Sequence, residues 1–248
     1  MTDVLAWRKV FGVLGPSTNT VVQPDFDDLR MPGVTNHYSR IIVQNPTALS
    51  DADFIRGTDA IDAATHDAVH AVMTCEPDYL VLGMSAVTFY GGAEGSAKWT
   101  RAVEDVAGTR LCTGSASLIE AFKAYGGIRR IAVLSPYFPV ANEQVRNFMS
   151  DHGIEVVRDT PLRCQSWLHI AKVTPAQLRD TILDLDGDDV DAIVQVGTNL
   201  SMVRLAAAAE TFLQKPVIAI NTATYWNALR QNGITDRKEG FGRLMAEF

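Results

Sequence analysis

Polar residues able to hold a small anion follow a short apolar run in the second half of the chain. The run Ala192–Val196 has the length and composition of a buried parallel strand, and Gly197, Thr198 and Asn199 come directly after it. A helical pattern then begins, so backbone N–H groups at the turn should be free to bind an anion. Taken alone, the pattern is equally compatible with an ordinary turn that binds nothing.

A second apolar run of the same kind lies in the first half of the chain. Tyr79–Gly83 is expected to form a strand, and Ser85, Ala86 and further small or polar residues follow it as far as Gly92. Open α/β sheets bind ligands beyond the carboxyl ends of their strands. Two turns of this kind, one in each half of the chain, favour a site between two similar halves.

A third polar loop follows the first expected strand, Phe11–Gly15. It contains Ser17, Thr18 and Asn19, whose hydroxyl and amide groups are typical of a turn. Because the loop lies just past the carboxyl end of a strand, these groups are also candidates for binding the ligand.

Strands and helices are expected to alternate through almost the whole chain, which is typical of a parallel α/β architecture. No Pro-rich or Ser-rich linker separates the two halves, so we expect them to be closely joined. The expected strands are 11–15, 35–43, 79–83, 110–113, 131–135, 154–157, 192–196 and 217–220; the expected helices are 58–73, 93–106, 118–125, 136–152, 174–185, 202–213 and 222–231.

One stripe of the expected helix 58–73 carries Asp62, His66 and His70 at intervals of four residues. Side chains with this spacing share one helix face and could bind a metal ion, but no further ligand is evident. A solvated polar face is the favoured interpretation, and we predict no metal site.

Composition limits the kind of partner. The chain of 248 residues has a net charge of −7, is 47% hydrophobic and 21% charged, and has no large basic cluster, so nucleic acid is not an expected partner. No apolar run approaches the roughly 20 residues of a membrane span. The first residues lack the pattern of a secretion signal, and three widely spaced cysteines fit a reducing compartment, so a cytoplasmic protein is expected.

Several of these segments together resemble the maleate cis-trans isomerases. Their matching motifs are 11–20 with Gln23-Pro24-Asp25, Ser135-Pro136-Tyr137 and Gly197-Thr198-Asn199-Leu200, whereas the segments 85–92 and 112–113 resemble arylmalonate decarboxylase. The resemblance covers nearly the whole chain and points to the aspartate/glutamate racemase superfamily.

This resemblance implies an α/β fold with two similar parallel-sheet halves and the active site in the cleft between them. We expect residues 1–113 with 221–248 to form one half and residues 114–220 to form the other. It also implies a small-molecule carboxylate as substrate and no metal or organic cofactor, and it is compatible with a homo-oligomer.

The chain departs from the family at its cysteines. Maleate isomerases and glutamate racemases use a cysteine at each of the two strand-end turns, and arylmalonate decarboxylase keeps only the second. Here the first position is taken as Ala86, or Ser85 if the loop shifts by one residue, and the second as Gly197. Thiol chemistry is therefore not expected, and the three cysteines are interpreted as structural.

A further departure lies at Trp167 and His169, where the isomerases have Asn and an acidic residue. Trp167 either forms an apolar wall of the site or simply packs between the halves. His169 is the best replacement for the missing proton carrier by its ordinary pKa, although a surface role is equally compatible. Tyr137 and Ser85 are the other candidate catalytic residues.

The remaining candidates would bind the substrate carboxylate or stabilise an enediolate. The leading hypothesis is a cofactor-independent isomerase or decarboxylase that acts on a small organic acid without cysteine. The alternatives are a hydrolase or hydratase that uses a bound water, and a non-catalytic carboxylate binder. The candidate binding residues are Ser17, Thr18, Asn19, Ser85, Ala86, Tyr137, Trp167, Gly197, Thr198 and Asn199.

Overall fold

Eight parallel strands form two separate four-stranded sheets in the computed structural model, which describes residues 3–45 and 50–248. Most of these strands read as continuous apolar runs because helices cover the sheets. The N-terminal sheet has the order β2(Val34–Ile41), β1(Lys9–Pro16), β3(Tyr79–Leu82), β4(Leu111–Cys112); the C-terminal sheet has the order β6(Glu155–Pro161), β5(Arg130–Ser135), β7(Ala192–Gln195), β8(Val217–Ala219).

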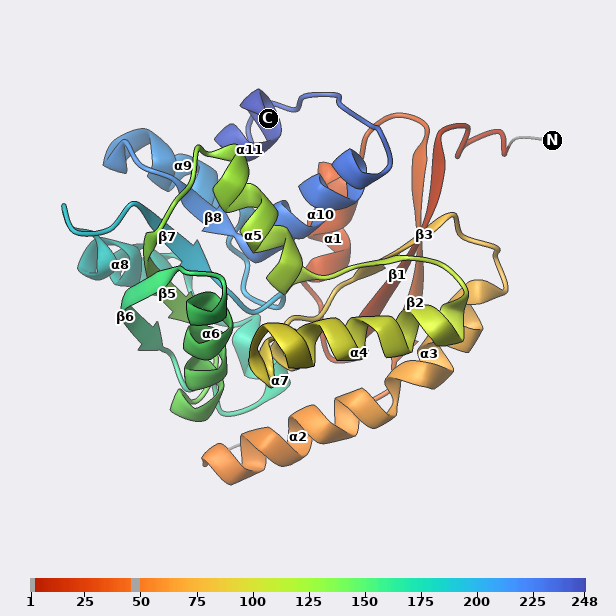
Figure 1. Ribbon diagram of the computed structural model, residues 1–248, viewed down its shortest axis with the longest axis horizontal. Coiled ribbons are helices and arrows are strands. Elements are labelled where there is room, and N and C mark those ends of the chain that lie inside the picture. The colour runs from red at the N-terminus through yellow and green to blue at the C-terminus, as the bar shows by residue number, and fades with distance from the viewer. Residues whose placement is uncertain (1–2, 46–49) are drawn as a thin grey trace.

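Helices connect the strands and pack around both sheets (Figure 1), so the α/β class and the two similar halves expected from the sequence are confirmed. Sheet strands β1–β3 lie on one side of the view and β5–β8 on the other. The helices are α1(Val22–Leu29), α2(Asp51–Ala63), α3(Thr65–Met73), the 3₁₀ turn η1(Ala86–Phe89), α4(Gly92–Ala107), α5(Gly114–Ala124), α6(Pro139–Asp151), α7(Trp167–Ile170), α8(Pro175–Leu185), α9(Val203–Leu213), α10(Ile220–Gln231) and α11(Arg243–Glu247).

The two sheets have the same internal register. The N–H of Gly83, just after β3, donates to the Leu14 carbonyl of β1 at 2.6 Å, and the N–H of Val196, just after β7, donates to the Leu134 carbonyl of β5 at 2.9 Å. Gly83 is thus equivalent to Val196, and the next residue, Met84, is equivalent to Gly197. The sequence-based pairing of Gly197 with Ala86 or Ser85 is therefore corrected to Met84.

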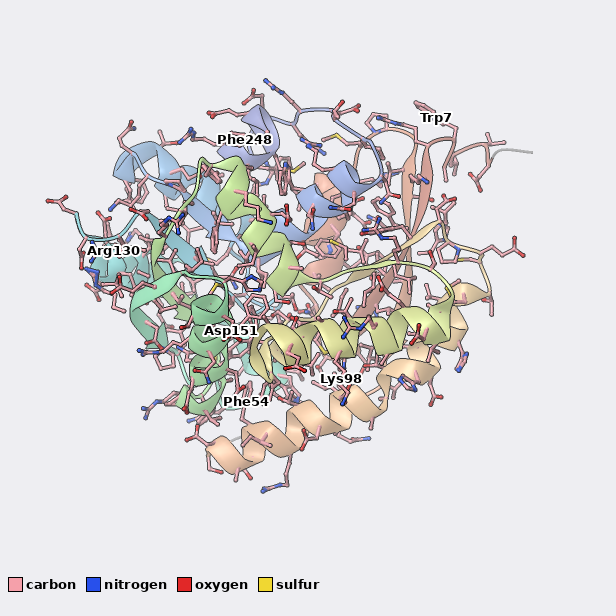
Figure 2. All side chains as sticks on the ribbon, viewed as in Figure 1. Trp7, Phe54, Lys98, Arg130, Asp151 and Phe248 are labelled. Carbon is pink, nitrogen blue, oxygen red and sulfur yellow. The ribbon has the colours of Figure 1, made fainter. Side chains whose placement is uncertain are left out.

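Contacts between the halves hold the carboxyl ends of both sheets together. Helix α10 follows the C-terminal sheet but packs against α5 and α1. On another side, Asp151 at the end of α6 accepts a 2.8 Å hydrogen bond from the N–H of Ala93 in the first turn of α4, and Figure 2 shows Asp151 beside that helix end. A carboxylate at a helix N-terminus also interacts favourably with the helix dipole.

The expected strands are all present, but several helical regions differ from expectation, and η1, α7 and α11 were not expected. The helix predicted over 58–73 is two helices, α2 and α3, which meet at Ala64. Helix α1 was not expected; the Oδ1 of Asn19 accepts from the N–H groups of Val21 and Val22 and so satisfies two donors at its start. Val22, Phe26 and Leu29 are buried at helical spacing, so this short helix also packs one apolar face against the core.

Two negative findings concern the residues that the structure describes. None of their helices combines the length and apolar character needed to cross a bilayer. In the same ranges, 3–45 and 50–248, no three His, Cys, Asp or Glu side chains are grouped as a metal site. Asp62 instead accepts a 2.5 Å hydrogen bond from the indole N–H of Trp99, which ties α2 to α4.

Candidate functional site

A cavity opens where the carboxyl ends of the two sheets face each other. Its empty space, counted out to the mouth and including open solvent, is about 440 Å³. Loops from both halves contribute to it, as the sequence predicted for a site between them. The lining residues are Pro16, Thr18, Asn19, Ile61, Met84, Ser85, Ala86, Tyr137, Trp167, Ile170, Gly197, Thr198 and Asn199.

Two equivalent turns present backbone N–H groups at this cavity. One turn is 84–86, between β3 and η1, and the other is 197–199, after β7. Within the described ranges, the N–H groups of these six residues have no hydrogen-bond partner. Unpaired N–H groups that gather on a concave surface bind anions. The two turns are therefore the candidate positions for binding a negatively charged group.

The side chains of Ser85 and Tyr137 cross from one half to the other. Their hydroxyl oxygens are 2.7 Å apart, and either can be the donor. One of the two protons lies between them, which leaves the other free to point at a ligand. Burial raises the pKa of Tyr137 well above its ordinary value, so the phenol stays protonated and acts as a donor.

A second crossed pair joins Asn19 to Thr198. The amide of Asn19 donates to Thr198 Oγ1 at 3.0 Å, and Thr198 Oγ1 donates to the carbonyl of Gly83 at 3.0 Å. The only hydroxyl proton of Thr198 is thus used within the protein, so this side chain braces the turn. Its backbone N–H remains available to a ligand.

The side chain of Asn199 also forms hydrogen bonds within the protein. Its Oδ1 accepts from the N–H of Thr20 at 3.0 Å, and its Nδ2 donates to the carbonyl of Trp167 at 2.9 Å. Asn199 therefore lines the cavity and connects three loops around it. Its side-chain carbonyl and one amide proton are already hydrogen-bonded within the protein, so its main contribution is to hold those loops in place.

Gly197 and Met84 occupy equivalent positions with opposite consequences for space. Gly197 has a φ of +99°, and a Cβ built on it would overlap the ring of Pro136. A side chain at this position, including that of cysteine, would be strained by the positive φ and would require the Pro136 ring to move. Met84 fills the corresponding position in the other half with a long apolar side chain that is 4% exposed.

An apolar wall closes the remaining side of the cavity. It consists of Trp167 and Ile170 from α7 and Ile61 from α2, with Phe54 packed behind them. The ring of Phe54 lies 5.1 Å from that of Trp167, and Figure 2 places Phe54 in the region of α2 and α6. A Cβ added to Gly57 of α2 would lie 2.6 Å from Cζ2 of Trp167, so the indole packs directly on the helix backbone.

The structure brings most of the predicted site residues together, with two exceptions. His169 is exposed, is not part of the cavity lining, and accepts through Nδ1 a 3.3 Å hydrogen bond from the N–H of Gln165. Ser17 is also exposed, and its Oγ accepts a 3.1 Å hydrogen bond from the N–H of Val43. Sequence reasoning missed Met84, although its position one residue before Ser85 at a strand end was a usable signal.

No cysteine belongs to the described lining of the cavity. Cys112 is buried at the end of β4 beside Ser117 and Asn227, and burial raises the pKa of its thiol to about 11. Cys164 is buried as well, with its pKa also raised to about 11 by desolvation, and Cys75 is exposed. Thiols with raised pKa values are largely protonated near neutrality, which makes them poor nucleophiles.

The twin parallel sheets and the anion-binding cavity at their carboxyl ends define a two-lobed α/β protein with a site for a small acid. The chain belongs to the arylmalonate decarboxylase family, whose model matches residues 56–245. It is 27% identical over 172 residues to arylmalonate decarboxylase of Bordetella bronchiseptica, covering 66% of this chain and 69% of that protein. It is 28% identical to maleate isomerase of Pseudomonas putida, covering 55% of this chain and 54% of that protein.

A solved structure of the maleate cis-trans isomerase of Nocardia farcinica has the same fold. The two structures superpose with a TM-score of 0.86 at 20% identity, covering 97% of this chain and 99% of that one. That structure is a cysteine-to-serine variant with a covalently bound succinylcysteine intermediate. At this identity, the likeness concerns the fold.

Proposed function

We propose that the protein is a cofactor-independent enzyme that removes a carboxylate from a small organic acid, and that it does so without a cysteine thiol. The observation that supports this most directly is the pair of facing turns, 84–86 and 197–199, whose free N–H groups meet the Ser85–Tyr137 hydroxyls in one cavity. Such a set of donors is suited to an enediolate, in which negative charge spreads over two oxygens.

Decarboxylation suits these residues because it begins without a base. The bond between the α-carbon and the leaving carboxylate breaks, carbon dioxide departs, and the electron pair enters the remaining carboxylate to form the enediolate. A proton must then reach the α-carbon. Tyr137 can donate it, because carbon of this kind is a stronger base than a phenolate, and solvent restores the proton to Tyr137.

Isomerisation by proton abstraction is less well supported. It requires a group that removes a proton from carbon, and Tyr137 is the only ionisable side chain in the described lining. Its raised pKa keeps it protonated. The succinylcysteine intermediate of the Nocardia isomerase indicates a thiol route in that protein, for which this cavity offers no sulfhydryl group in its described lining.

The proposal is tested with 2-substituted malonates in heavy water, with the product followed by NMR. We expect release of carbon dioxide and one solvent deuteron at the α-carbon. Tyr137→Phe and Ser85→Ala should each lower kcat by roughly 10²–10³, the usual effect of losing one oxyanion donor. Tyr125→Phe is the matched control, because this phenol is bound to Glu210 away from the cavity and its removal should leave kcat nearly unchanged.

A non-catalytic carboxylate binder is the second candidate, and one observation favours it: the described lining has no group that titrates near neutrality. A binder would hold arylacetates and arylmalonates in calorimetry, lose affinity in Tyr137→Phe, and release no carbon dioxide from any malonate. Binding without turnover would select this candidate, whereas turnover with deuterium incorporation would exclude it.

A further inference from the structure

Asn221 lies in the first turn of α10, directly behind the ligand-facing turn 197–199. It is 1% exposed and is not part of the cavity lining, so it does not itself contact a bound molecule. Because α10 follows the C-terminal sheet but packs against α1 and α5, this residue stands where the two halves meet.

Both amide protons of Asn221 are used, and each goes to a different half. Nδ2 donates to the carbonyl of Thr198 at 3.0 Å and to Oδ2 of Asp25 in α1 at 2.8 Å. Both partners are acceptors, so the orientation of the amide is fixed: Nδ2 must face them. Thr198 is therefore held from behind by Asn221 and from the side by Asn19.

The remaining polar atom of Asn221 has no partner. Its Oδ1 is buried and makes no hydrogen bond to any of residues 3–45 and 50–248. A buried carbonyl without a partner destabilises the folded protein, and an apolar side chain at this position would avoid that cost. The residue is thus better suited to orienting its two acceptors than to stabilising the fold, and costly local features of this kind are typical of functional sites.

We propose that Asn221 is a positioning residue that, together with Asp25, holds the carbonyl of Thr198 away from the cavity and so aims the N–H groups of the 197–199 turn at the ligand. A peptide whose carbonyl is fixed on one side presents the next N–H on the other. This inference rests on the proposed function in one respect, namely that the turn binds a carboxylate.

The charge state of Asp25 can influence the 197–199 turn, because the amide of Asn221 bonds both Asp25 and Thr198. Desolvation raises the pKa of Asp25 to about 6, while the hydrogen bond from Asn221 opposes the rise. The other ionisable groups around this carboxyl are Asp28 of α1, which raises its pKa further, Arg204 of α9, which lowers it, and the phenol of Tyr38 on β2. An ionised Asp25 polarises the Asn221 amide more strongly than a protonated one.

The first test measures the turn without any ligand, by following the ¹⁵N–¹H signals of Gly197, Thr198 and Asn199 between pH 4.5 and 8. We expect them to shift with one midpoint near pH 6 in the wild type, and the shift to disappear in Asp25→Asn, which keeps an acceptor for Asn221 but cannot ionise. Signals that do not titrate in the wild type, or that titrate equally in the variant, would overturn the coupling.

The second test measures affinity for phenylacetate, used as the probe, by calorimetry. Asn221→Ala should weaken binding about tenfold or more, and Asn221→Ser, which keeps one donor and serves if the alanine variant does not fold, should weaken it less. Asn227→Ala is the control, because Asn227 is buried in the same helix but donates to Ser117 and Cys112 instead. Equal effects of Asn221→Ala and Asn227→Ala would assign Asn221 a merely structural role.

Failure of the inference differs from failure of the proposed function. If the wild type binds no carboxylate while its turn signals titrate as expected, the function is wrong and the coupling stands. If the wild type binds phenylacetate and Asn221→Ala binds it equally well, the inference is wrong and the function stands.

Discussion

Replacing Asp25 by asparagine should make the folded protein more stable at neutral pH. Asp25 is a carboxyl whose pKa is raised from 3.8 to about 6, mainly by desolvation. The folded state therefore holds the proton more tightly than the unfolded chain does. Below pH 3.8 the carboxyl is protonated in both states and does not lower the free energy of unfolding. The destabilisation grows as the pH rises and is complete above pH 6.

The magnitude follows from the two pKa values. Their difference, 6 − 3.8 = 2.2, corresponds to about 3 kcal/mol at about 1.36 kcal/mol per unit. The side-chain amide introduced by Asp25→Asn would still accept the hydrogen bond from Asn221, so the native contact is retained while the buried charge is removed. We expect the free energy of unfolding of Asp25→Asn to exceed that of the wild type by about 2–3 kcal/mol at pH 8.

Urea unfolding at pH 8, 6 and 4.5 measures this difference directly. The gain should be largest at pH 8 and should shrink steadily toward pH 4.5. The control is Asp28→Asn in the same helix, where an exposed carboxylate pairs with Arg204 and should change stability by less than about 1 kcal/mol. A loss of stability in Asp25→Asn at every pH, or a gain independent of pH, would refute the reasoning.

Three further outcomes are expected. A variant with all three cysteines replaced by serine should keep most of its turnover if it folds, as measured by release of carbon dioxide; a loss of several orders of magnitude with an intact fold would restore a thiol mechanism. Trp167→Ala should weaken binding of a ring-bearing monoacid about tenfold more than binding of acetate, as measured by calorimetry, because a flat apolar wall is lost; equal weakening would place the ring elsewhere. Gly197→Ala should destabilise the protein by more than Gly108→Ala in urea unfolding, because both glycines have positive φ but only at Gly197 would the new Cβ meet a neighbouring ring; equal destabilisation would mean that the proline yields.

The sequence predicted the strands and the loops of the site because each depends on local chemistry. Apolar runs such as Ala192–Val196 have few alternatives to a buried parallel strand, and Gly, Ser, Thr and Asn at their ends favour turns. The same reasoning identified Ser85, and the family resemblance added Tyr137 and Trp167; all three line the cavity. The family resemblance then implied that these loops converge.

Some features of the site could not be predicted from the sequence, because they depend on the register of the strands and on the direction in which side chains point. The equivalence of Met84 with Gly197 follows from hydrogen bonds between neighbouring strands, which no single segment encodes. His169 lies in a helix of four residues, too short for its periodicity to indicate which face is buried. Asn199 was expected to hold a carboxylate, but the partners that occupy its side chain, Thr20 and Trp167, come from loops distant in the sequence.

Met84 and Gly197 make the two sides of the cavity chemically different, because one position carries a long side chain and the other carries none. A planar intermediate held between the two turns would have one face against the methionine side chain and the other against bare backbone. Delivery of a proton should then succeed from the open face alone, so a prochiral malonate would yield one enantiomer in excess. Shortening the methionine, as in Met84→Ala, should reduce that preference, and chiral chromatography of the product would report it.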